Sequence, residues 1–253
     1  MWFERAKELI NNVEGDISLI VKNLNTGETF SYREDEVFPS ASIIKIPILM
    51  TLVEHVQDGK LDINEAYRIG DERIVGGAGI ILYLSDLPYT LLDYATLMTD
   101  LSDNTATNKL IDILGLEAIA ETCKAIGLQD TVLSRKLMHL DGINKTLKNL
   151  TSGRDMLKTF EWMHNNPERY ELAIKILKQQ LLNDLLPTYT EQTYDFAHKT
   201  GMITGTRHDV GIMYLKDPIF VSFLSKDLKD GMDGVRLANE LGVMIVEEFN
   251  KEA

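Results

Sequence analysis

The sequence contains little cysteine, and its one cysteine carries no sign of reactivity. A single Cys123 cannot form a disulfide within the chain. It continues an apolar series at helical spacing, with Leu116, Ile119, Ala120 and Ile126. A catalytic cysteine needs an electropositive, exposed setting, which this helix does not suggest. We therefore expect Cys123 to be a buried structural thiol.

An excess of basic residues and a long apolar run are also missing. The formal net charge is −13, from 39 acidic and 26 basic side chains, without a block of Lys and Arg. Nucleic acids and anionic membrane surfaces are bound through such blocks, so we expect neither as a partner. No apolar run approaches the roughly 18 residues of a membrane span. The N-terminus does not resemble a signal peptide, so the protein is either cytoplasmic or an exported form without its leader.

The histidines form no pattern that would bind a metal ion. His55, His164, His198 and His208 are scattered, without the H-x-x-x-H or H-E-x-x-H spacing that places two ligands on one helix face. We expect no metal and no other cofactor.

The order of hydrophobic patterns predicts an α+β fold. An amphipathic helix ends near Gly15 and is followed by a hairpin over 16–32. After a mainly helical stretch, three β-type runs occupy 194–200, 210–215 and 219–224, and a helix closes the chain. We expect a five-stranded antiparallel sheet flanked by the N- and C-terminal helices, with an all-helical domain inserted between its second and third strands.

These patterns also predict the domain boundaries. Residues 1–40 and 190–253 would form a discontinuous sheet domain, 41–189 the helical domain, and the cleft between them the active site. The helix predicted from Ser40 to about Gly59 carries apolar residues around nearly its whole circumference, so it should lie inside the protein. No strand pattern between 59 and 188 is convincing.

Three short motifs contain residues that could carry chemistry. Ser42 and Lys45 are one helical turn apart in Ser-Ile-Ile-Lys, where a desolvated amine could act as a base toward the hydroxyl. Read alone, this is a first-turn serine with an exposed lysine. Ser102-Asp103-Asn104 lies between two helical patterns, where its ordinary role is an N-cap.

The third motif is Lys199-Thr200-Gly201, which ends one strand pattern, while Arg207 begins the next. Alone, it reads as a strand end and hairpin. Two cations at one sheet edge in a protein of net charge −13 favour an anionic ligand.

Together and in this order, the motifs resemble the S-x-x-K, S-D-N and K-T-G set of class A β-lactamases and penicillin-binding proteins. Ser42 and Ser102 are 60 residues apart, as in the class A enzymes, and the resemblance covers essentially the whole chain. It implies a serine hydrolase with Ser42 as nucleophile and Lys45 as its activator.

The resemblance also implies the remaining roles. Ser102 would protonate the departing nitrogen, with Lys199 beside it, and Asn104 would bind the substrate's side-chain amide. The other implied groups are the Ser42 and Met202 backbone N–H groups, which would form the oxyanion hole, and Thr200, Gly201 and Arg207, which would bind a substrate carboxylate. The implied partner is a small β-lactam or peptidoglycan-like molecule, and we expect a monomer.

One feature departs from this family. Class A β-lactamases carry a Glu that activates the water for deacylation, but the chain has no Glu between Glu121 and Glu161. Asp141 is a substitute candidate, although an Asp-Gly turn explains it equally, and His139 is a second. We therefore expect Ser42 to be acylated and to deacylate slowly. The alternative is a penicillin-binding receptor, or a DD-peptidase-like or esterase-like protein, without efficient β-lactam turnover.

Overall fold

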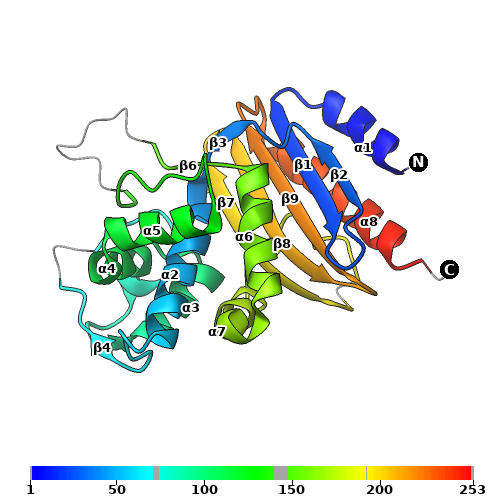
Figure 1. Cartoon of the computed structure of the whole chain (residues 1–253). Helices are drawn as coiled ribbons and strands as arrows, with labels where there is room; N and C mark the ends of the chain where they lie inside the picture. Colours follow the sequence, from blue (N-terminus) through cyan, green and yellow to red (C-terminus); the bar gives the residue numbers. More distant parts are fainter. Residues whose placement is uncertain (1, 71–73, 139–147, 192, 252–253) are drawn as a thin grey trace.

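The chain folds into an antiparallel sheet with a helical lobe at one end (Figure 1). This computed structural model describes residues 2–70, 74–138, 148–191 and 193–251. The predicted α+β fold with a five-stranded antiparallel sheet is confirmed.

The sheet is built from both ends of the chain. Its strand order is β2-β1-β9-β8-β7, and every neighbouring pair is antiparallel. The three predicted C-terminal runs are each longer in the structure than in the sequence pattern. The strands are β1 (Asp16–Asn23), β2 (Thr29–Tyr32), β7 (Asp195–Ile203), β8 (Thr206–Tyr214) and β9 (Pro218–Lys226).

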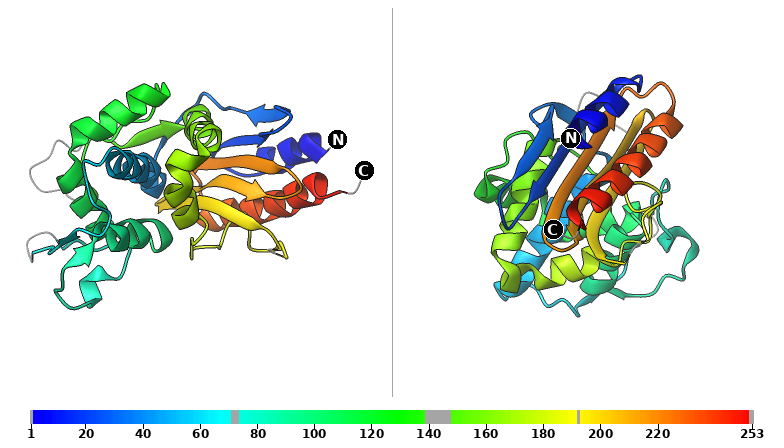
Figure 2. Two further views of the ribbon diagram at one scale, coloured as in Figure 1. Left: turned by 60° about the horizontal axis from the view of Figure 1, so that its bottom comes forward. Right: turned by 90° about the vertical axis from the view of Figure 1, so that its right-hand side faces the viewer.

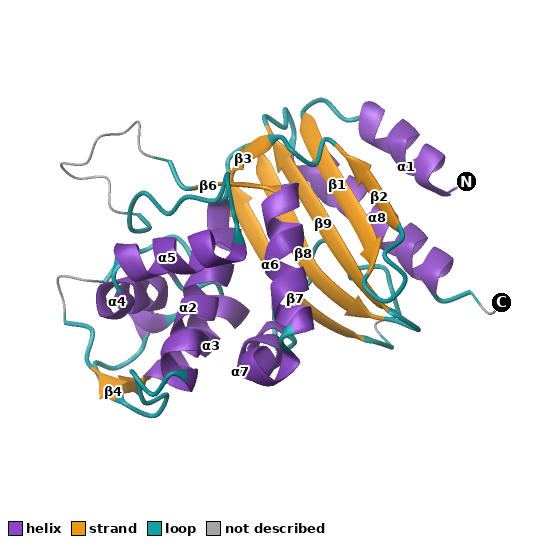
Figure 3. Cartoon of the chain, in the orientation of Figure 1, coloured by secondary structure: helices purple, strands orange, loops and turns teal. Residues whose placement is uncertain are grey.

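Helices cover both faces of the sheet. On one face lie α1 (Trp2–Asn11) and α8 (Gly231–Phe249), which pack side by side (Figure 2). On the opposite face lies α6 (Gly153–Asn165), against β1 and β9 (Figure 3). This double cover explains why β1 is apolar almost without alternation, since residues on both of its faces are buried.

The helical lobe surrounds α2 (Lys45–Gln57). Its first nine residues, through Val53, are all buried, as the apolar circumference predicted. Around it pack the remaining helices, which are α3 (Leu91–Asp100), α4 (Asn104–Leu114), α5 (Leu116–Ile126) and α7 (Pro167–Leu177). Cys123 on α5 is buried, as expected, and burial raises the pKa of its thiol to about 11.

The expectation of no strand between 59 and 188 is wrong. The strands β4 (Ala66–Tyr67) and β5 (Tyr89–Thr90) pair with each other. A third strand, β6 (Leu150–Ser152), pairs with β3 (Val37–Pro39). Two or three residues are too few to show a period-2 pattern, so these strands depend on their tertiary partners and leave no sequence signal.

No helix in the described part of the chain is both long enough and apolar enough to cross a membrane.

Candidate functional site

The first motif lies where a short 3₁₀ turn, η1 (Ala41–Ile44), runs into α2. Ser42 is in the turn and Lys45 is the first residue of α2, so their side chains meet one turn apart. The Lys45 Nζ lies 3.1 Å from the Ser42 Oγ, and the lysine side chain is buried, with the residue 1% exposed. The alternative of an exposed lysine is therefore wrong.

Lys45 also joins the first motif to the second. Its Nζ lies 2.7 Å from the Ser102 backbone oxygen, 2.9 Å from the Ser102 Oγ and 3.0 Å from the Asn104 Oδ1. Four oxygens thus surround one nitrogen, one more than an ammonium has hydrogens to donate. The arrangement suits a nitrogen that donates to some of them and can accept a proton from a hydroxyl.

Burial sets the charge state of this amine. It lowers the pKa of Lys45 well below its ordinary value, the nearby Lys199 ammonium lowers it further, and Asp103 opposes both. An unprotonated amine next to a serine hydroxyl can act as a general base.

The second motif combines its expected structural role with a place in the site. Asp103 is the N-cap of α4, and its carboxylate accepts the Ala106 backbone N–H at 2.9 Å. The other carboxylate oxygen accepts the backbone N–H groups of Ile80 and Ile81. Ser102 is not the cap: it precedes the cap with φ +54°, a left-handed conformation that is uncommon for serine and directs its hydroxyl to Lys45.

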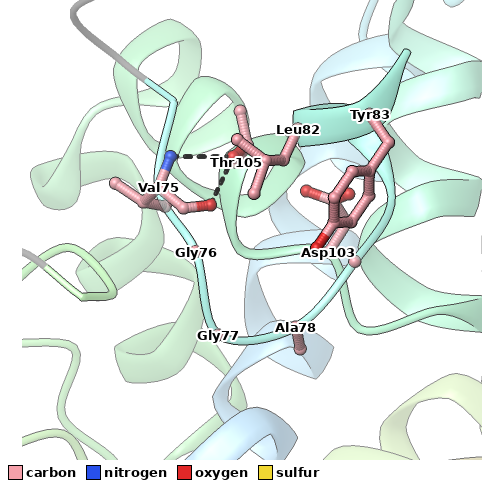
Figure 4. Close-up of a pocket in the computed structure, with 9 residues that line it drawn as sticks. Val75, Gly76, Gly77, Ala78, Leu82, Tyr83, Asp103 and Thr105 are labelled. Carbon is pink, nitrogen blue, oxygen red and sulfur yellow. Dashed lines mark hydrogen bonds between the residues drawn. The ribbon is translucent and has the colours of Figure 1, made fainter.

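A glycine-containing loop lies beside this turn. Residues 75–79, together with Leu82, Tyr83, Asp103 and Thr105, line a small pocket (Figure 4). The Thr105 hydroxyl accepts the Val75 backbone N–H and donates to the Val75 carbonyl oxygen. The Asn104 Nδ2 donates to the Gly76 carbonyl oxygen. Ser42 does not line this pocket, so the pocket adjoins the site without containing its nucleophile.

The third motif places a second buried lysine near the first. Lys199 on β7 is fully buried, and its Nζ donates to the Thr200 carbonyl oxygen at 3.1 Å. Burial lowers the pKa of Lys199 to about 7, while Asp209 and Asp100 oppose that shift. Lys199 is therefore about half protonated at pH 7, and the two carboxylates favour its charged form.

Gly201 allows β7 to approach η1 closely. A Cβ at Gly201 would lie 3.3 Å from the Ala41 Cβ and 3.3 Å from the His208 ring and its Cβ. This close packing keeps β7 beside the turn that carries Ser42. Met202, the next residue, is largely exposed, so its backbone lies at the surface end of the strand.

Arg207 lies on β8 directly across from Met202. Its guanidinium donates to the carbonyl oxygens of Thr206 and Ile203. A Cβ at Gly231 would lie 2.6 Å from its Nη2, so the side chain rests against the start of α8. The structure thus holds Arg207 at the end of the β7–β8 hairpin, two residues beyond Thr200 in the pairing.

His208 is a buried residue that the sequence analysis did not place in the site. Its Nε2 lies 2.7 Å from the Pro39 carbonyl oxygen, and its Nδ1 accepts the Ser225 backbone N–H at 3.1 Å. Burial lowers the pKa of His208 to about 4, so the ring is neutral at physiological pH. It fastens β8 and β9 to the segment just before Ser42.

This histidine predicts a loss of stability on acidification. Its pKa is lower in the folded chain than in the unfolded chain, where it is about 6.5. The free energy of unfolding does not depend on this ring above pH 6.5, where the ring is neutral in both states. Between pH 6.5 and pH 4 the unfolded chain binds a proton that the folded chain does not, so the free energy of unfolding falls by about 3 kcal/mol in total. We expect His208→Gln to have a flatter dependence of the free energy of unfolding on pH in this window. Urea titrations at several pH values test this, and equal slopes in both proteins would contradict it.

The two deacylation candidates, Asp141 and His139, lie outside the described residues. The ends of the segment that contains them are held together. The Asn149 Oδ1 accepts the backbone N–H groups of Ser134 and Arg135, and its Nδ2 donates to the Arg135 carbonyl oxygen. The Asn149 carbonyl oxygen in turn accepts the Ser40 N–H, two residues before Ser42.

Sequence analysis missed the acidic residues near Lys199. Asp100 ends α3 and Asp209 lies on β8, and neither belongs to a motif. What distinguishes these two residues is their electrostatic effect on the buried Lys199, which depends on the fold and is not visible in the linear sequence. Among the described residues, no group of three or more His, Cys, Asp or Glu is arranged to hold a metal ion.

Comparison with families and curated proteins gives consistent results. The model of the beta-lactamase enzyme family matches residues 3–249. β-Lactamase SME-1 of Serratia marcescens is 29% identical over 140 residues, which are 54% of this chain and about half (48%) of that protein. A β-lactamase of Bacillus licheniformis is 26% identical over 254 residues, covering 96% of this chain and 82% of that protein.

Solved structures match this chain over nearly its full length. A β-lactamase of Sphaerobacter thermophilus has a TM-score of 0.90 at 24% identity, over 98% of this chain and 96% of that chain. PBP-A has a TM-score of 0.89 at 27% identity, over 99% of this chain and 96% of that chain. A variant of PBP-A has been solved as an acyl-enzyme complex with penicillin G.

Proposed function

Because this chain belongs to the beta-lactamase enzyme family, we propose that it is an acyl-transfer enzyme whose Ser42 is acylated by β-lactams or related amides and esters. The observation that carries this proposal is the buried Lys45 amine, 3.1 Å from the Ser42 Oγ. The acyl-enzyme solved for a PBP-A variant supports it, as a finding on a protein that is 26% identical.

Acylation begins with proton transfer from serine to lysine. The Ser42 hydroxyl gives its proton to the neutral Lys45 amine as the Oγ attacks the carbonyl carbon, forming the C–O bond. The backbone N–H groups of Ser42 and Met202 stabilise the negative oxygen of the tetrahedral intermediate. The close packing of Gly201 on Ala41 holds these two segments beside each other.

Collapse of the intermediate breaks the carbon–nitrogen bond. Ser102 gives its hydroxyl proton to the departing nitrogen and recovers a proton from Lys45, whose Nζ lies 2.9 Å from the Ser102 Oγ. The proton taken from Ser42 therefore reaches the leaving group through a chain of three side chains. The Lys199 ammonium adds positive potential beside Ser102.

The remaining roles concern substrate binding. Asn104 donates one amide hydrogen to Gly76 and keeps a second for an amide oxygen of the substrate. Thr200, Gly201 and Arg207, with Lys199 behind them, bind the substrate's carboxylate at the end of β7. A locally positive site in a chain of net charge −13 selects for such an anionic group.

Deacylation is proposed to be slow. The chain has no Glu between Glu121 and Glu161, the segment where class A β-lactamases carry the residue that activates water. Asp141 is the candidate to replace that Glu in activating the water. If it does not act, the acyl-enzyme persists and the protein behaves as a penicillin-binding receptor, or as a DD-peptidase-like or esterase-like enzyme with another acyl substrate.

A chromogenic cephalosporin distinguishes these outcomes. Slow deacylation predicts a burst of about one molecule of product per molecule of protein, followed by a much slower steady rate. A linear time course with rapid turnover would instead mean that a group such as Asp141 completes hydrolysis. Neither a burst nor turnover, with this substrate and with benzylpenicillin, would contradict acylation by β-lactams.

A further inference from the structure

The backbone directly before Ser42 is strained. Ala41 has a φ of +44°, a left-handed conformation that is uncommon for a residue with a side chain. Strain of this kind persists only where neighbouring groups hold the backbone in place. One such group is His208 on β8, whose Nε2 lies 2.7 Å from the Pro39 carbonyl oxygen, two residues before Ala41. The position of Ser42 therefore depends in part on a histidine from the sheet.

The neighbours of the His208 ring decide which of its nitrogens carries the proton. A carbonyl oxygen can only accept, so the Nε2 donates to Pro39. A backbone N–H can only donate, so the Nδ1 accepts from Ser225, 3.1 Å away. The Arg207 carbonyl oxygen also lies 3.1 Å from the Nδ1, which in this form has no hydrogen to donate to it. The buried ring is therefore neutral with its proton on Nε2, as expected where burial lowers the pKa of the ring to about 4.

The His208 ring packs against both β7 and β3. Gly201 pairs with His208 in the β7–β8 ladder, and a Cβ at Gly201 would lie 3.3 Å from the ring and 3.3 Å from the Ala41 Cβ. On the β3 side, the buried Phe38 ring meets the imidazole edge-on, with 6.2 Å between the ring centroids. The ring thus lies against both segments that are proposed to form the oxyanion hole.

Ser225 on β9 extends this network to Arg207. The β8–β9 ladder reaches Asp209, which lies opposite Phe223. Beyond it, the Ser225 hydroxyl accepts the Arg207 backbone N–H and donates to the Arg207 carbonyl oxygen, both at 2.7 Å, while the Ser225 N–H donates to the His208 ring. The network therefore connects the backbone of Arg207, which is proposed to bind the substrate's carboxylate, with the residues before the nucleophile.

We infer that His208 is a positioning residue for acylation: its Nε2–H holds the Pro39 carbonyl oxygen and so keeps the Ser42 Oγ and N–H aligned with β7 for attack on a carbonyl carbon. This inference rests on the proposed acyl transfer at Ser42. His208 is fully buried and acts through the backbone of residues 39–42 rather than on the substrate. Without this donor the strained backbone at Ala41 can relax, and a displacement of about 1 Å at the reacting atoms lowers a rate by about 10²-fold.

Two amide variants test the Nε2–H bond separately from the Nδ1 contact. His208→Asn places an amide oxygen near the position of the Nδ1, where it can accept the Ser225 N–H, but its side chain is too short to reach Pro39. His208→Gln is one carbon longer and can donate to Pro39. We expect His208→Asn to lower the acylation rate constant at saturating penicillin by about 10–100-fold, with little change in the concentration that gives half of the maximal rate. His208→Gln should recover most of the rate. Rapid mixing with a fluorescent penicillin and quenching at successive times measures both quantities.

A destabilised variant in the helical lobe separates positioning from a general loss of stability. Tyr170→Phe removes a hydroxyl that donates to the Glu54 carboxylate and accepts the Trp162 Nε1–H. It should lower the thermal midpoint without changing the acylation rate constant, because Glu54 lies about 14 Å along α2 from Lys45. The final extent of labelling gives the folded fraction of each variant, so the rate constants compare folded protein only. If His208→Asn does not fold, His208→Met, which fills the space without a donor, provides the same comparison with His208→Gln.

The outcomes are distinct. A slow His208→Asn, a largely restored His208→Gln and an unaltered Tyr170→Phe support the role of His208. A wild-type rate constant in His208→Asn, or equally slow His208→Asn and His208→Gln, would overturn that role and leave the proposed function standing. A Tyr170→Phe as slow as His208→Asn would also overturn it, because lost stability alone would then explain the effect. No labelling of the wild type at any time would overturn the proposed function, and with it the role of His208.

Discussion

Replacement of Ser42 by alanine is expected to abolish covalent labelling by penicillins completely. The change removes the only oxygen proposed to attack the carbonyl carbon. It should leave the fold intact, because Ser42 is half-buried and Lys45 keeps its three other oxygen neighbours on Ser102 and Asn104. Labelling with a fluorescent penicillin measures the effect, and an unchanged thermal midpoint shows that the protein is folded.

A neighbouring serine supplies the matched control. Ser40 is buried two residues earlier, and the one hydrogen bond of its hydroxyl to the described residues is long, 3.4 Å to the Ala41 carbonyl oxygen. Ser40→Ala should label at nearly the wild-type rate. An adduct that persists in Ser42→Ala would show that another residue is the nucleophile.

Replacement of Lys45 by methionine should have the second-largest effect, lowering the acylation rate constant by about 10³-fold. Methionine fills the same volume but cannot accept the Ser42 proton, and general-base catalysis typically contributes 10²–10⁴-fold. The oxygens of Ser102 and Asn104 lose a donor, so we also expect the free energy of unfolding to fall by about 1–2 kcal/mol.

The control for this variant is an exposed lysine. Lys175→Met on α7 makes the same chemical change at the surface and should leave acylation unaltered. Rapid mixing with a penicillin and quenching at successive times gives the rate constants. Acylation of Lys45→Met within about tenfold of the wild type, below the usual effect of a general base, would contradict the assignment of Lys45 as the base.

The elements that the sequence predicted are those with long apolar patterns. The terminal helices, the five sheet strands and the buried helix α2 each extend over enough residues for periodicity to be visible. The strands β3, β4, β5 and β6 have two or three residues each, and they form because a partner segment lies beside them. Their existence follows from the tertiary structure, which local patterns do not contain.

The site shows the same division. Ser42, Lys45, Ser102 and Asn104 were identified by motif, and the structure brings them together around one nitrogen. Their catalytic roles stay predictions. The surroundings that set the charges were not predicted, because the burial of Lys45 and Lys199 and the approach of Asp100 and Asp209 depend on how α2, α3, β7 and β8 pack. Spacing along the chain identifies functional groups, whereas burial determines whether they can exchange protons.

The central claim is that Ser42 is acylated and that the acyl-enzyme then persists. Intact-protein mass spectrometry over time, after mixing with benzylpenicillin, tests both parts at once. We predict a mass increase equal to one whole penicillin, located on Ser42 by peptide mapping, that outlasts removal of free penicillin. A transient adduct with hydrolysed product would contradict slow deacylation, and no mass increase at any time would contradict acylation by penicillins.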